Sequence, residues 1–315
     1  MKAVFLDQAT FSPEVALSTP DGVSEFVRYD STPNDSDTII ARTINADIII
    51  TNKVIISRDV IARLPKLKLI QLTATGTDNV DKTACDEFGV ALYNVVGYSK
   101  DSVPEHTFML MLSAMRAVKD YHNKATDGRW QASGKFCLLD TPIFDLAGKT
   151  LGIIGRGVIG QKVGQIASAF GMTVLYAERQ GKAPRDGYTA FDDVLANADI
   201  ISLHCPLNDD TRHLINTDTI AKMNQRPLII NVARGAVVDT HAITSALVNE
   251  QILGYATDVL EQEPPADEPL FALKDHPRVI ITPHNAWGSL SAQQRMWDIV
   301  CHQVGKFIQS HQPHH

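Results

Sequence analysis

The sequence predicts an α/β protein built from two doubly wound parallel sheets, each with helices on both faces. Short, almost wholly apolar runs alternate with amphipathic stretches along the chain, which is the pattern of parallel strands buried on both faces. The chain has 315 residues, more than a single hydrophobic core usually supports. A glycine-rich segment at 155–160 directly follows one of the apolar runs. Two domains of the same general architecture are therefore expected.

The first domain is expected to contain five strands. Their apolar runs are KAVFL, EFVRY, ADIII, LKLIQL and VALYNV, at 2–6, 25–29, 46–50, 67–72 and 90–95. After them, Ser102 and Glu105 have the spacing of a capping box, with Pro104 in the first turn of the helix that would follow. We place the first crossing between domains just before this helix.

The second domain is expected to contain six strands. Their runs lie at 150–155, 173–178, 198–204, 227–233, 254–259 and 279–284. A last amphipathic stretch at about 289–310 could return to pack on the first domain. The predicted domains are 1–100 plus 287–315, and 101–286.

Composition excludes several classes of partner. The net charge is −7 and no basic stripe occurs, which argues against a nucleic-acid or an anionic-membrane partner. The most apolar helical stretch is too short to span a bilayer, and the N-terminus lacks the pattern of a signal peptide. Four cysteines are scattered without a C-x-x-C pair, so neither a disulfide framework nor a metal site is expected. We expect a cytoplasmic protein.

The glycine segment has the context of a Rossmann-like dinucleotide site. It joins a strand to an apolar-periodic helix, and Glu178 ends the next strand. The glycines allow a tight turn and close approach of the pyrophosphate, the helix N-terminus attracts the phosphates, and Glu178 would accept hydrogen bonds from the ribose. A 2′-phosphate should be repelled by Glu178, which favours NAD(H), while Arg179 leaves NADP(H) open as a second cofactor. The predicted cofactor residues here are Gly155, Arg156, Gly157, Val158, Ile159, Gly160, Glu178 and Arg179.

Three charged residues follow strand-like runs of the second series: Arg234, Glu263 and His284. Ligands of an open parallel sheet bind outside the carboxyl ends of its strands, so these residues should share one edge with the glycine segment. Hydride transfer from a hydroxy acid needs a base for the hydroxyl proton, which a histidine supplies. Arginine suits a carboxylate or carbonyl group, and a carboxylate beside the histidine would orient it and stabilise its charged form.

Four segments together resemble the D-isomer-specific 2-hydroxyacid dehydrogenases. They are GIIGRGVIG, NVARGAVVD, ATDVLEQEPP and ITPHNAW, and QLTATGTDNVD in the first domain extends the match over nearly the whole chain. The stretches TPIFDLAGKTLGIIG and VLYAERQG are most similar to the glycerate dehydrogenase, or hydroxypyruvate reductase, branch.

The resemblance implies an active-site cleft between two Rossmann-like domains and a homodimer formed largely through the nucleotide domain. It implies that Arg234 binds substrate, that Glu263 orients the histidine and that His284 is the acid/base. Further implied contacts are the substrate carboxylate on Ala74, Thr75, Gly76 and Thr77, the adenine near Pro206, and the nicotinamide carboxamide on Asp258.

The expected activity is NAD(H)-dependent interconversion of a small 2-oxo acid and its D-2-hydroxy acid, with hydroxypyruvate or glyoxylate as the favoured substrate. Enzymes of the D-lactate or phosphonate type are alternatives. An NAD-sensing corepressor, a binding protein that keeps the catalytic residues, is an alternative from another class.

Overall fold

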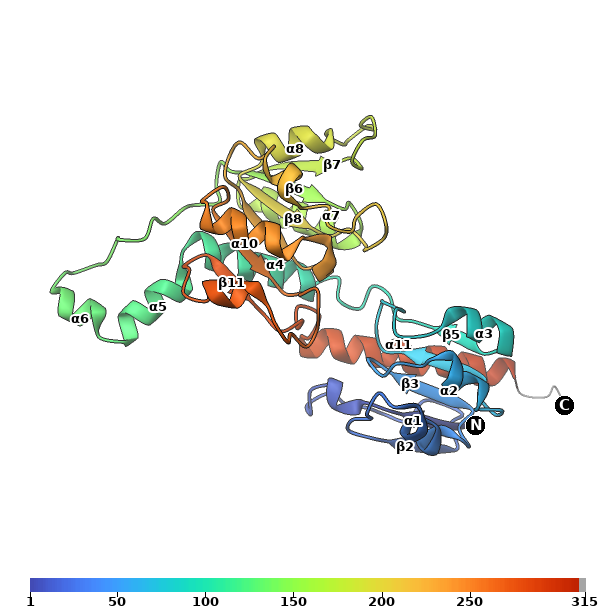
Figure 1. The fold of residues 1–315 in the computed structure, drawn as a ribbon. Coiled ribbons are helices and arrows are strands. Elements are labelled where there is room, and N and C mark those ends of the chain that lie inside the picture. The colour runs from blue at the N-terminus through green and yellow to red at the C-terminus, as the bar shows by residue number, and fades with distance from the viewer. Residues whose placement is uncertain (312–315) are drawn as a thin grey trace. The chain divides into compact units, whose positions relative to one another are not determined.

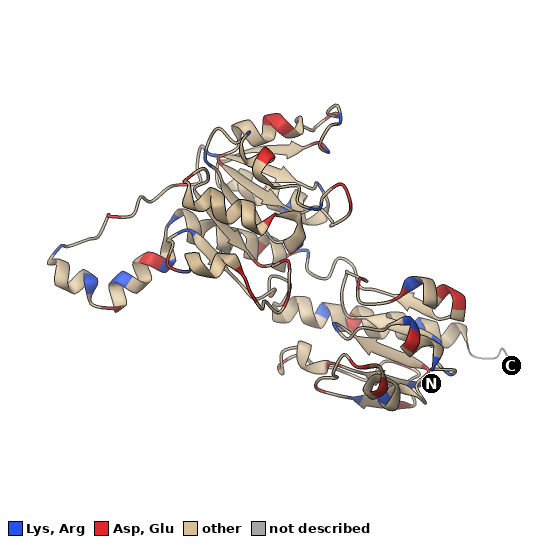
Figure 2. Cartoon of the chain, viewed as in Figure 1, with Lys and Arg blue, Asp and Glu red and all other residues tan. Residues whose placement is uncertain are grey.

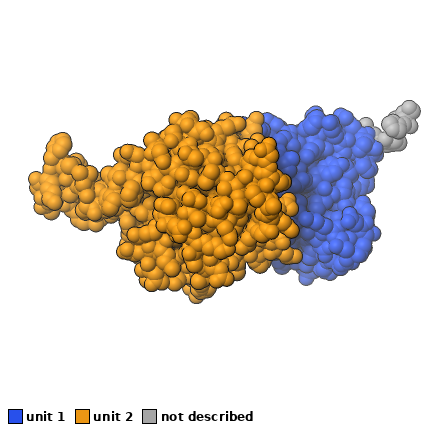
Figure 3. All heavy atoms as spheres, turned by 90° about the horizontal axis from the view of Figure 1, so that it is seen from above, with its two compact units in different colours: residues 1–99, 288–315 blue, residues 100–287 orange. Residues whose placement is uncertain are grey.

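The computed structural model describes residues 1–311, and the chain divides into two compact units (Figure 3). Unit 1 combines residues 1–99 with the segment that begins at Gly288, and unit 2 comprises residues 100–287. Residues 312–315, the end of the predicted segment 287–315, lie outside the described residues.

Unit 1 is built on a five-stranded parallel sheet in the order β2-β1-β3-β4-β5 (Figure 1). This is the strand order of a flavodoxin-like doubly wound sheet. Every residue of β3 and β4 is buried, as expected for central parallel strands covered on both faces. The strands are β1 (Lys2–Phe5), β2 (Glu25–Arg28), β3 (Ile48–Thr51), β4 (Leu69–Leu72) and β5 (Ala91–Tyr93). The helices are η1 (Gln8–Thr10), α1 (Ser36–Thr43), α2 (Arg58–Ala62), α3 (Lys82–Phe88) and α11 (Leu290–Ser310).

The last helix, α11, packs on the sheet of unit 1, as the amphipathic stretch predicted. Its Trp297 is fully buried and stacks on Phe5, with ring centroids 5.4 Å apart. Phe11 meets the same indole edge-on, and the indole N–H donates to the carbonyl of Ser18 at 3.0 Å. A buried tryptophan whose N–H has an acceptor contributes strongly to packing. The C-terminal helix α11 is therefore part of the hydrophobic core that the N-terminal strands form.

Unit 2 is built on a six-stranded parallel sheet in the order β11-β10-β9-β8-β6-β7. All eleven predicted strands are therefore present, and the predicted fold class is confirmed. The strands are β6 (Thr150–Ile154), β7 (Thr173–Ala177), β8 (Ile200–Leu203), β9 (Leu228–Asn231), β10 (Gly254–Thr257) and β11 (Val279–Ile281). The helices are α4 (Ser102–Met115), α5 (Val118–Thr126), α6 (Arg129–Ser133), α7 (Val158–Ala169), α8 (Phe191–Asn197), α9 (Thr217–Ile220), η2 (Gly235–Val237), α10 (Thr240–Val248) and η3 (Pro269–Leu273).

The strand order of unit 2 places a topological switch point between β6 and β8. The chain leaves β6 toward β7 on one side and continues through β8 to β11 on the other. At the outer edge of β7, no further full strand of the described chain pairs with the sheet. Only a single bridge joins Ala177 of β7 to Thr189. Ligands of doubly wound sheets bind at such a switch point, outside the carboxyl ends of the strands. The glycine segment at 155–160 begins at this point.

The start of α4 differs from the predicted capping box. The helix begins at Ser102 itself, with Asp101 in the N-cap position. The hydroxyl of Ser102 donates to the carbonyl of Ala286 at 2.6 Å, so it serves a tertiary contact instead of capping its own helix. The capping-box prediction was wrong because sequence spacing carries no information about this distant acceptor.

Acidic and basic residues occur along both units. In the view of Figure 2, basic and acidic residues are intermingled along the elements of both units. Within residues 1–311, no helix is both long enough and apolar enough to cross a bilayer.

Candidate active site

The glycine segment forms a tight turn between β6 and α7. Gly155 has a φ of +103°, and a Cβ there would lie 2.6 Å from the backbone of His204 and Cys205. A Cβ at Gly160 would collide with the carbonyl oxygen of Gly155. Gly157 is the N-cap residue of α7 and provides no side-chain hydrogen bond. Among the described residues, no atom lies within 4 Å of the position that a Cβ of residue 157 would take. The helix start thus presents an open surface that suits a pyrophosphate group.

Glu178, directly after β7, is held by Arg185. The guanidinium donates to both carboxylate oxygens, at 2.6 and 2.9 Å. The backbone N–H groups of Arg179 and Arg185 donate to the same two oxygens, at 2.9 and 3.2 Å. The contact with Arg185 lowers the pKa of Glu178 to about 2. The acidic side chain at the end of the second strand is thus fully charged, and sequence reasoning missed its partner.

The end of β8 is closely packed and largely apolar. Burial lowers the pKa of His204 to about 3 and raises the pKa of Cys205 to about 11. The ring Nε2 of His204 shares a hydrogen bond of 2.8 Å with the hydroxyl of Ser202. Pro206 follows on the surface, and its carbonyl accepts from Thr211. The predicted adenine neighbour therefore lies at the carboxyl end of a strand beside the switch point.

Asp258, after β10, anchors the loop that carries His284. It is 2% exposed, and its carboxylate accepts from the Thr282 hydroxyl at 2.6 Å. The N–H groups of Asn285 and Ala286 also donate to it, at 3.0 and 2.8 Å. Its predicted contact with the nicotinamide stays a prediction, and the structure gives it a second task that the sequence did not reveal.

His106, on α4, joins the same network. Its Nε2 lies 2.9 Å from the Thr282 hydroxyl and 3.4 Å from the Asp258 carboxylate. Burial lowers the pKa of His106, and the charge of Asp258 only partly opposes this effect. The ring is therefore neutral at neutral pH. Its spacing from Asp258 along the chain is too large for a sequence motif to reveal the contact.

Glu263 and His284 are brought together, as their positions after β10 and β11 predicted. Nδ1 of His284 lies 2.5 Å from a carboxylate oxygen of Glu263, and the other oxygen accepts from the N–H of Leu260 at 2.8 Å. The two side chains are 27% and 32% exposed, so both remain accessible. His284 has a φ of +52°, and its N–H donates to the carbonyl of Asp258. A positive φ is uncommon for a non-glycine residue, so the backbone at His284 is held in a conformation that most residues avoid.

Arg234 lies at the adjacent strand end, after β9. Asn231 fixes its backbone by donating to the Arg234 carbonyl, and the guanidinium donates to the carbonyl of Ala233 at 2.8 Å. A Cβ at Gly235 would collide with the backbone of Leu260, so the Arg234 turn packs against the loop that leads to Glu263. Within residues 1–311 no direct contact of Arg234 with Glu263 or His284 is recorded.

The predicted carboxylate loop, Ala74 to Thr77, belongs to unit 1 and follows β4. It is fixed from outside, because the Thr75 hydroxyl donates to the carbonyl of Val95 and Asn94 donates to the carbonyl of Thr75. The N–H groups of Thr75, Gly76 and Thr77 have no recorded acceptor within residues 1–311. Unpaired N–H groups in a fixed loop suit an anionic ligand.

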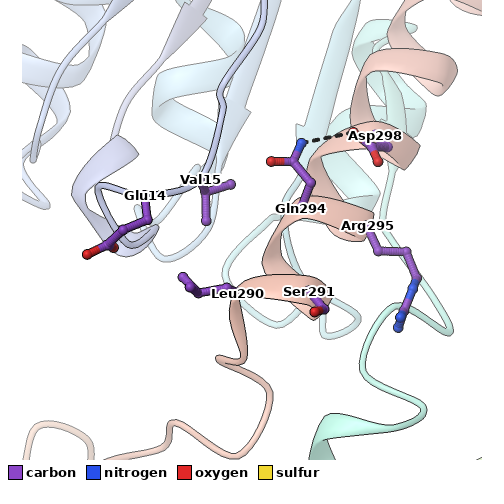
Figure 4. A pocket seen from close by; sticks show the side chains of 7 residues that line it. All are labelled: Glu14, Val15, Leu290, Ser291, Gln294, Arg295 and Asp298. Atoms are coloured by element: carbon purple, nitrogen blue, oxygen red, sulfur yellow. Dashed lines mark hydrogen bonds between the residues drawn. The ribbon is translucent and has the colours of Figure 1, made fainter.

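A cavity of about 520 Å³ lies elsewhere in unit 1, beside the first turns of α11 (Figure 4). Its acidic and basic side chains include Glu14, Arg295 and Asp298, and Gln294 donates to Asp298 at 3.0 Å. None of the predicted site residues is among the described residues that line it.

Sequence comparison with known proteins supports a nucleotide-binding site in unit 2. Residues 108–286 match the sequence profile of the D-isomer-specific 2-hydroxyacid dehydrogenase NAD-binding domain. The chain belongs to the D-isomer-specific 2-hydroxyacid dehydrogenase family. A glycerate dehydrogenase of Methylorubrum extorquens is 39% identical over 98% of this chain and 96% of its own length. A hydroxypyruvate reductase of Blautia hydrogenotrophica is 32% identical, over 98% and 97%.

A solved structure extends the comparison to three dimensions. D-lactate dehydrogenase from Aquifex aeolicus, complexed with NAD and lactic acid, is 26% identical, with a TM-score of 0.79 over 98% of this chain and 96% of that one. The chain is thus an NAD(H)-dependent oxidoreductase of the 2-hydroxyacid dehydrogenase family, as predicted. The roles of the individual site residues stay predictions.

Proposed function

We propose that this enzyme reduces a small 2-oxo acid, hydroxypyruvate or glyoxylate first, to the D-2-hydroxy acid at the Glu263–His284 pair. The observation that carries the proposal is the contact of 2.5 Å between Nδ1 of His284 and Glu263. It commits one ring nitrogen to a carboxylate and leaves Nε2 to exchange a proton with substrate. The relatives named glycerate dehydrogenase and hydroxypyruvate reductase support the choice of substrates.

Each residue has a separate task in the proposed reaction. NADH held at the segment Gly155 to Gly160 would supply the hydride for the substrate's carbonyl carbon. His284 gives its Nε2 proton to the carbonyl oxygen, which leaves the ring neutral, and Glu263 stabilises the charged ring before that transfer. Arg234 holds and polarises the substrate with a planar, two-pronged donor.

The carboxylate of the substrate is assigned to unit 1. The N–H groups of Thr75, Gly76 and Thr77 would receive it, in the way that backbone loops hold anions. Unit 1 is accordingly the substrate domain, and unit 2 is the nucleotide domain. The pyrophosphate would lie at Gly155 to Gly160, and the nicotinamide carboxamide beside Asp258.

Steady-state turnover tests the proposal. The purified protein is assayed with NADH and hydroxypyruvate, glyoxylate or pyruvate, and separately with NAD⁺ and a phosphonate. We expect the highest kcat/KM with hydroxypyruvate or glyoxylate. A kcat/KM for pyruvate that is about tenfold higher would indicate a D-lactate-type enzyme. Binding of NADH without turnover of any substrate would indicate a sensing protein instead.

We also propose that the enzyme is a homodimer and that helices α5 and α6 take part in the interface. Figure 1 shows these helices projecting from the rest of unit 2. In the irregular segment that follows them, Phe136 is 96% and Leu139 is 74% exposed, and the nearby Trp130 is also exposed. Large apolar side chains grouped on one projection are typical of a protein interface. Sedimentation should give a dimer for the wild type and a monomer for Phe136→Glu/Leu139→Glu; a monomeric wild type would contradict the proposal.

A cytoplasmic location is proposed on the state of the cysteines. Cys85, Cys137, Cys205 and Cys301 are all free thiols, which suits a reducing compartment. Cell fractionation with an antibody to the protein tests this location, and recovery outside the cytoplasmic fraction would contradict it.

A further inference from the structure

The carboxylate of Glu178 has no acceptor site left for a ribose. An ionised carboxylate offers about four lone-pair positions, and Glu178 receives four hydrogen bonds, three of them from Arg185. Its side chain is only 3% exposed, whereas that of Arg185 is 61% exposed. The arginine thus covers the carboxylate from the solvent side. Ribose hydroxyl groups can reach Glu178 only if Arg185 gives up part of this contact.

The loop that supplies Arg185 is built to keep positive charge beside Glu178. Residues 179–188 leave β7 and return where Thr189 pairs with Ala177, in place of a full third strand. This stretch contains three basic residues and one acidic residue.

The ring of Tyr188 contacts the guanidinium groups of Arg185, in the same loop, and of Arg156, in the glycine segment. The guanidinium carbon of Arg185 lies 4.4 Å from the Tyr188 ring centroid, and that of Arg156 lies 5.2 Å away. Arg156 also donates to the carbonyl of Gly187 at 3.1 Å. Stacking on an aromatic face holds an arginine in place while its N–H groups stay available. A phosphate on the ribose would therefore meet guanidinium groups as well as the repelling carboxylate.

We propose that Arg185 is a specificity-determining residue for the cofactor: it competes with the ribose hydroxyls of NAD(H) for Glu178 and is the counter-ion for the 2′-phosphate of NADP(H). The enzyme therefore binds both cofactors, and Arg185 narrows the preference for NAD(H) that Glu178 alone would give. The inference rests on the proposed placement of the adenosine ribose at Glu178. Arg179, which the sequence singled out, contributes its backbone N–H to Glu178.

The test is direct binding to the full-length protein without substrate. Dissociation constants for NADH and NADPH are measured by nucleotide fluorescence in the wild type and in Arg185→Ala. We expect NADH to bind several-fold more tightly in the variant, because Glu178 is released, and NADPH to bind about tenfold or more weakly, the usual effect of losing a charged hydrogen bond. Displacement of NADH by 2′,5′-ADP, compared with 5′-AMP, isolates the phosphate subsite and should be lost in the variant.

Lys182→Gln is the matched control. It removes the same charge from the same loop, at a side chain with no recorded contact to Glu178. An equal shift in this control would reduce the effect to general electrostatics and overturn the assignment. An unchanged ratio of the two dissociation constants in Arg185→Ala, or equal weakening of both cofactors, would also overturn it. Because no substrate is present, these outcomes do not depend on the proposed reaction.

Discussion

Two carboxylates at strand ends of the same sheet have basic partners, but they are built differently. Glu178 is buried and receives four hydrogen bonds, and its pKa is about 2. Glu263 is about one-third exposed, and its carboxylate accepts from a backbone N–H and contacts an imidazole. A saturated, buried carboxylate is suited to a fixed charge, whereas an accessible acid–imidazole pair is suited to proton exchange. We therefore propose that the Glu178–Arg185 pair selects the cofactor and that the Glu263–His284 pair carries the proton transfer.

The largest effect should follow from removing the imidazole. His284→Gln keeps a polar side chain but cannot exchange a proton at neutral pH. We expect kcat for the oxo acid to fall by about 10²–10⁴-fold, the usual contribution of a general acid or base, while NADH binds as in the wild type. Steady-state kinetics with a separate NADH titration measures both quantities. Activity within a few-fold of the wild type would mean that another group supplies the proton.

A smaller loss is expected for Arg234→Lys. An ammonium group keeps the charge but cannot reproduce a planar two-pronged contact. The loss in transition-state stabilisation should be about 2–4 kcal/mol, measured as kcat/KM. The turn should still fold, because Asn231 fixes it through the backbone carbonyl of residue 234. Wild-type kcat/KM in this variant would remove Arg234 from the substrate site.

The smallest effect should be on the cofactor side. Glu178→Gln removes the charge that repels a 2′-phosphate, so the preference for NADH over NADPH should shrink by about tenfold. Because the pKa of Glu178 is about 2 and the second pKa of a phosphate monoester is about 6, both groups stay fully charged between about pH 7.5 and 9, and the wild-type preference should be constant there. Dissociation constants at several pH values measure it. A wild-type preference that changes strongly over this range would assign the discrimination to another group.

The sequence predicts the strands and their order along the chain better than it predicts contacts between side chains. All the strands could be predicted because a buried parallel strand needs an unbroken apolar run. The meeting of Glu263 and His284 followed from the rule that parallel strands end at one edge. Arg185 was missed because the path of its loop decides what it reaches. His106 was missed because only the packing of α4 against the sheet brings it to Asp258.

One experiment tests most directly whether Glu178 and Glu263 have separate roles. Single-turnover oxidation of bound NADH by hydroxypyruvate is followed in Glu263→Gln and Glu178→Gln, alongside NADH titrations of both variants. We predict that Glu263→Gln slows the turnover by at least about tenfold at saturating NADH, with an unchanged dissociation constant, because only the charge beside His284 is lost. Glu178→Gln should alter the dissociation constant and leave the turnover rate at saturation intact. If both variants change the same quantity, the two carboxylates do not have separate tasks and the account is wrong.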